Sequence, residues 1–64
     1  MLSIVSGEMI REVRMIDMLG QVVYNSAVQG ERHELNVNGF RNGIYFVQVL
    51  TARGITTQRI QIVK

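Results

Sequence analysis

Apolar and polar residues alternate along most of this chain with the two-residue period of β-strands. The densest such segment is Ile44–Leu50, where β-branched and aromatic residues enclose a single polar residue, Gln48. Alternate side chains of a strand point to opposite faces, which divides this segment into two apolar sets: Tyr45, Val47 and Val49 on one face, and Ile44, Phe46 and Leu50 on the other. Two apolar faces predict a central strand that other parts of the chain cover.

Turn signals stand on both sides of this segment. Asn42 and Gly43 precede it, and both residue types tolerate the backbone conformations of tight turns. Gly43 and Tyr45 form a Gly-x-Tyr sequence similar to the tyrosine corner of β-sandwiches, in which a phenol bonds back to the preceding turn. Thr51–Gly54 predicts a hairpin turn, and Ile55–Val63 predicts an antiparallel returning strand.

The segment Glu8–Leu19 fits two patterns. Four of its apolar residues fall near helical spacing, which permits an amphipathic helix. Val13 and Met15 instead follow a two-residue period, and Asp17–Gly20 fits a type I turn capped by the aspartate and closed by a left-handed glycine. Because the β-rich residues Gln21–Tyr24 follow at once, we favour a hairpin and keep the helix as the alternative.

The other segments are shorter. Met1–Val5 predicts a strand ended by a breaker at Ser6-Gly7, and the polar residues Asn25–Arg32 predict a loop. Glu34–Val37 predicts another strand, followed by a turn in which Phe40 is expected to be a buried anchor. About six short strands in all favour an all-β fold, an antiparallel β-sandwich.

Composition narrows the class of protein. A chain of 64 residues with 47% hydrophobic residues and no cysteine folds as one small domain that depends on packing or on a partner. No apolar run reaches the ~20 residues needed to cross a bilayer, so we expect no direct membrane insertion. The net charge is only +2 and the arginines are scattered, which argues against a nucleic-acid partner.

Candidate chemistry is sparse. His33 is the only histidine, and its neighbours Glu31 and Glu34 do not form a metal-ligand set. We expect a surface loop histidine, with no metal, no cofactor and no catalytic residue. The glycines at the turns are isolated and do not form a phosphate-binding loop. The sequence therefore predicts a protein that is not an enzyme.

Three segments, in this order and spacing, resemble the C-terminal sorting domain of the type IX (Por) secretion system: Val13–Val23, Leu35–Val49 and Gln58–Lys64. The features shared with that family are an Asp-x-x-Gly turn followed by valine, Gly-x-Tyr with alternating valines, and a basic and apolar final strand. The resemblance covers most of the chain. It assigns recognition or structural roles to ten residues: Asp17, Gly20, Gly43, Tyr45, Val47, Val49, Arg59, Ile60, Ile62 and Lys64.

The resemblance implies an immunoglobulin-like β-sandwich that acts as a secretion signal for an attached cargo. The cargo would pass through the periplasm to the outer-membrane surface or the extracellular space. The implied partners are the type IX translocon and a surface sortase-like peptidase. Family members begin with an Asn-Pro-containing strand that is absent here, so we expect residues 1–64 to be an N-terminally truncated domain with its first strand and cargo upstream.

Two further expectations follow. Without the first strand, one sheet edge is left exposed, and such an edge allows a homodimer. The alternative function is a non-catalytic adhesive or spacer module of a cell-surface protein, with the same fold and no role in export.

Overall fold

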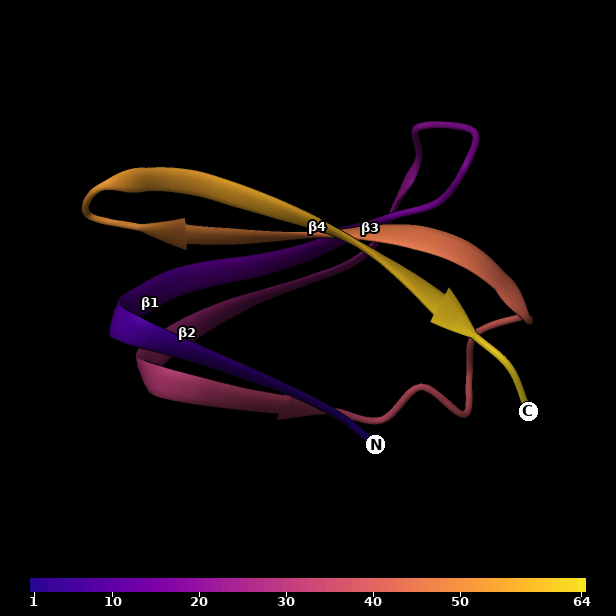
Figure 1. Ribbon diagram of the computed structural model, residues 1–64, viewed down its shortest axis with the longest axis horizontal. Helices are drawn as coiled ribbons and strands as arrows, with labels where there is room; N and C mark the ends of the chain where they lie inside the picture. Colours follow the sequence, from indigo (N-terminus) through magenta and orange to yellow (C-terminus); the bar gives the residue numbers. More distant parts are fainter.

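The computed structural model describes residues 1–64 as four antiparallel strands in one sheet, with no helix (Figure 1). The strands are β1 (Leu2–Ile16), β2 (Val22–Leu35), β3 (Gly43–Thr51) and β4 (Gly54–Ile62). Their order across the sheet is β2-β1-β3-β4, so β1 and β3 are internal. No helix long and apolar enough to cross a membrane is present.

Three predictions from the sequence are confirmed. The segment after Glu8 is strand, not helix, and forms the β1–β2 hairpin through the turn at Asp17–Gly20. The segment Ile44–Leu50 lies within β3, which pairs with β1 on one side and β4 on the other. The hairpin turn before Gly54 is also present, and Gly54 has a φ of 131°.

The predicted division into about six strands and two sheets is wrong. Ser6-Gly7 does not end a strand but lies inside β1, and the predicted loop Asn25–Arg32 lies inside β2. The backbone of this polar segment pairs with β1, for example Asn25 with Arg14. Ser26 and Val28 alternate with exposed neighbours and are half-buried, which is the pattern of a strand with one face on the core.

A bulge explains why two long strands give a compact molecule. Val5 pairs with Arg32 and Ile10 with Gly30, so the four residues Ser6–Met9 of β1 lie opposite the single residue Glu31 of β2. Extra residues on one strand bend a ladder. The hairpin therefore folds back under the rest of the sheet (Figure 1). The expected two-sheet sandwich is replaced by a single sheet that is bent over itself.

The core lies between the two halves of this bent sheet. Its seven buried residues come from all four strands: Ile10, Val13, Met15, Leu35, Tyr45, Val47 and Ile62. Leu2 and Ile4 from the folded-back half pack against this cluster. The opposite face of β3, with Ile44, Phe46 and Leu50, is half-buried and lies outside the cluster. The prediction that both faces of this strand are covered is therefore only half right.

Candidate recognition surface

Asp17 and Gly20 build the turn between β1 and β2. One carboxylate oxygen of Asp17, Oδ1, accepts hydrogen bonds from the backbone N–H groups of Leu19 and Gln21, both at 2.9 Å. The N–H of Gly20 donates to the Asp17 carbonyl at 3.1 Å, and Gly20 has a φ of 84°. The predicted capping role of Asp17 is confirmed. The fixed turn presents Met18 and Leu19 to solvent, with 64% and 83% of their surfaces exposed.

Gly43 and Tyr45 hold the start of β3 against the loop before it. The Tyr45 hydroxyl donates to the Arg41 carbonyl at 2.8 Å, while the ring is buried. The phenol thus reaches back to the preceding turn, as the Gly-x-Tyr sequence predicts. Gly43 has a φ of 155°, so the residue before the tyrosine uses a conformation that favours glycine.

The end of the chain is fastened to the same loop. The backbone N–H of Lys64 donates to Asn42 Oδ1 at 3.2 Å, and its Nζ donates to the Asn38 carbonyl at 2.6 Å. Just before it, Ile62 is buried and Ile60 is half-buried against the core. The loop between β2 and β3 is therefore held by Tyr45 on one side and by Lys64 on the other.

The ten candidate residues do not converge on one cleft. Asp17 and Gly20 form the β1–β2 turn, and Gly43, Tyr45 and Lys64 surround the loop at residues 36–42. Val47, Val49, Ile60 and Ile62 line the core side of β3 and β4. Arg59 pairs with Phe46 in register and so lies on the outer face, where it is exposed.

A groove that the sequence did not predict lies between the folded-back start of β1 and the β3–β4 hairpin. It has a volume of about 560 Å³, and its walls include Leu2, Ile4, Val49 and Ile60. Residues that are half-buried around the core are thus accessible from this groove. Local sequence does not predict this groove, because the groove forms only where the bend in β1 brings distant parts of the chain together.

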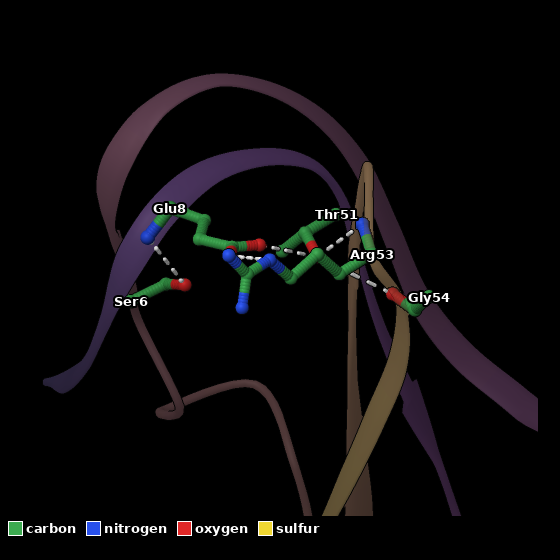
Figure 2. Close-up of polar contacts among 5 residues, drawn as sticks. All are labelled: Ser6, Glu8, Thr51, Arg53 and Gly54. Carbon is green, nitrogen blue, oxygen red and sulfur yellow. Dashed lines mark hydrogen bonds and ion pairs between the residues drawn. The ribbon is translucent and has the colours of Figure 1, made fainter.

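Glu8 and Arg53, two of the residues that line this groove, form an ion pair, and Figure 2 shows the polar contacts around it. The Arg53 guanidinium in the β3–β4 turn contacts the Glu8 carboxylate in the bulge of β1. The Thr51 hydroxyl donates to the same carboxylate at 3.4 Å and accepts from the Arg53 N–H at 3.2 Å. Ser6 Oγ accepts from the Glu8 N–H at 3.2 Å. This network joins the bulge to the hairpin turn.

The structure corrects the placement of His33. It lies in β2, not in a surface loop, and is half-buried. Its Nε2 is 2.8 Å from the Tyr24 hydroxyl. Phe40 packs edge-on against both Tyr24 and Tyr45, with ring centroids 6.3 and 6.1 Å apart. His33 thus belongs to a group of aromatic rings that covers one end of the core.

Charge is divided unevenly along the chain. All five acidic residues lie before Leu35, whereas residues 35–64 contain four cationic side chains and no acidic one: Arg41, Arg53, Arg59 and Lys64. The three ion pairs involve Arg14, Arg32 and Arg53. The hairpin of β3 and β4, together with its flanking residues, is therefore a cationic half of the molecule.

The fold and these sites define a small all-β domain. Its candidate residues form turns, part of the core, and a C-terminal strand whose end is hydrogen-bonded to the loop before β3. The chain belongs to the secretion system C-terminal sorting domain family, whose model matches residues 1–64. This confirms the resemblance seen in the sequence. The family consists of sorting signals of the type IX system, so membership implies interaction with that machinery and export to the cell surface or the extracellular space. No curated protein and no solved structure shows significant similarity to the chain.

Proposed function

We propose that this domain is a folded secretion signal that directs an attached cargo across the periplasm and through the type IX translocon to the cell surface. The family match over residues 1–64 carries this proposal. The family's sorting signals are not catalytic, and we assign the domain no reaction of its own.

The structure supports a signal that the translocon recognises in its folded form. β4 contributes Ile62 to the core, Ile60 packs against that core, and Lys64 is hydrogen-bonded to the loop before β3. The C-terminal residues are therefore part of a fixed surface and not a free peptide. A translocon component that reads them meets them in a defined geometry, which lowers the entropy cost of recognition.

After export, a surface sortase-like peptidase is the second partner that we assign to the domain, through its family. Its role would be to separate the domain from the cargo at the cell surface. The adhesive or spacer module remains the competing function. It requires the same fold but no translocon, so the two functions differ in whether the domain is needed for export.

A reporter fusion tests the proposal. A periplasmic reporter with its own signal peptide is joined to the N-terminus of the domain and produced in cells with and without a type IX translocon. We expect surface reporter only in cells that have the translocon. Deletion of residues 57–64 removes most of β4 and should leave the reporter in the periplasm. Export that persists after the deletion would favour the adhesive or spacer module.

A further inference from the structure

The outer edge of β4 is open and is not interrupted by a bulge. β4 pairs only with β3, and its nine residues keep continuous register from Thr51↔Gly54 to Gly43↔Ile62. In an antiparallel ladder, alternate residues direct their N–H and C=O groups away from the neighbouring strand. On β4 these groups face no other strand. An edge of this kind is a template for another strand.

β4 also lacks the features that protect sheet edges from pairing. It contains no proline and no bulge, and Arg59 is its only charged residue. The opposite edge, β2, has Glu31, Arg32 and Glu34 close together and three irregularities in its pairing with β1. Charges and bulges are the usual means of blocking an edge. Of the two edge strands, β4 is therefore the one that can pair with a further strand.

The two faces beside this edge differ in chemistry. On the inner face, Ile60 lies in the wall of the groove that runs to Leu2 and Ile4, and polar residues such as Gln58 share this wall. On the outer face, Arg59 is exposed and forms no ion pair. A strand that pairs with β4 would direct alternate side chains toward the groove and the others toward the outer face that carries Arg59.

We infer that β4 binds an extended segment of a partner protein by strand addition, and that this segment alternates apolar with acidic residues. The apolar side chains lie against the apolar residues of the groove, and the carboxylates face Arg59. Main-chain hydrogen bonds provide affinity, and the alternating side chains provide specificity. The inference stands on the open edge and its charge and does not rest on the proposed function.

A second copy of this chain is another occupant that an open edge allows. The charges disfavour it, because β4 and its flanks carry Arg53, Arg59 and Lys64 with no acidic side chain. Pairing β4 with another β4 brings like charges together, whereas an acidic strand brings opposite charges together. The two occupants therefore predict opposite effects of salt.

Peptide binding to the purified domain tests the inference, and its result does not depend on whether the domain directs export. The probe is a blocked nine-residue peptide that alternates glutamate and valine. One control peptide has lysine in place of glutamate. A second keeps every glutamate but has proline in place of two valines, which prevents strand pairing. Binding is followed by changes in the backbone amide signals of the domain in NMR spectra.

We expect the glutamate peptide to bind, with signal changes along β4 and not along β2. The proline peptide should bind about tenfold more weakly and the lysine peptide not at all. Arg59→Glu should weaken binding of the glutamate peptide about tenfold. Arg32→Glu makes the same charge change on β2 and should have no effect. Both arginines are exposed, so both variants should keep the fold.

Other results would overturn the inference. Equal binding of the glutamate and lysine peptides would show that charge does not select the partner. Signal changes confined to β2 would show that the partner binds β2 and not β4. Self-association that strengthens with added salt, together with no peptide binding, would assign the edge to a second copy. Binding of the glutamate peptide that weakens as salt is added is the result expected here.

Discussion

Tyr45 connects the core to the loop that carries the end of the chain. The residue is only 8% exposed, and its hydroxyl donates to the Arg41 carbonyl at 2.8 Å. Phe40 packs edge-on against it. A single side chain thus combines burial, an aromatic contact and a turn hydrogen bond.

We predict that Tyr45→Ala destabilises the domain by roughly 3 kcal/mol or more, because it removes a buried aromatic side chain and leaves a cavity. Tyr45→Phe keeps the ring and loses only the hydrogen bond, so its cost should be about 1 kcal/mol. Denaturant melts of both variants measure the difference. Equal destabilisation by the two substitutions would mean that the ring contributes little to stability.

Gly43 allows a test of the backbone alone. It has a φ of 155°, and an added Cβ would meet no atom within 4 Å. Gly39, in the same loop, has equally open surroundings and no positive φ. We predict that Gly43→Val destabilises the domain by about 1–2 kcal/mol through backbone strain, and that Gly39→Val costs less. Melts in which both variants match the parent would show that the conformation at Gly43 is not needed.

The elements differ in how much of them the sequence predicts. The turns at Asp17–Gly20 and Thr51–Gly54 are specified by residues within a few positions, and both are present. The alternation in Ile44–Leu50 likewise identifies a central strand. The path of the chain through Ser6-Gly7 and Asn25–Arg32 depends instead on pairing between β1 and β2. The sequence signal at Ser6-Gly7 fits both the end of a strand and a bulge inside one, and only the pairing with β2 decides for the bulge.

The site shows the same division between local and non-local signals. The roles of Asp17 and Tyr45 in their turns can be predicted from local sequence. The Glu8–Arg53 ion pair joins residues that are far apart in the chain, and it forms only because the bulge in β1 faces the β3–β4 turn. The groove that these two residues line has the same origin.

Hydrogen exchange tests the strand order. β3 is paired on both sides, as is β1 from Ile10 onward, whereas β4 is paired on one side only. We predict slow amide exchange throughout Tyr45–Val49, and alternating slow and fast exchange along β4. Uniformly slow exchange along β4 would indicate that its outer edge is already covered by another strand.

At the scale of the whole molecule, the small core limits stability. Only seven of 64 residues are buried, and there is no disulfide. A domain of this size is expected to be stable by only a few kcal/mol, so the loss of one large core side chain is enough to unfold it. A single core substitution can therefore unfold the domain while its surface residues stay the same. Comparing its export with that of a surface variant separates the need for folding from the need for particular surface residues.

The central claim is that the folded domain, and not a linear stretch of its sequence, is the export signal. The most direct test measures surface reporter for fusions that carry the parent domain, Tyr45→Phe or Tyr45→Ala, alongside the folded fraction of each purified domain. We predict that export falls in the same order as the folded fraction, with Tyr45→Ala left in the periplasm. If the Tyr45→Ala domain is unfolded in isolation and its fusion is still exported as well as the parent, the claim is contradicted.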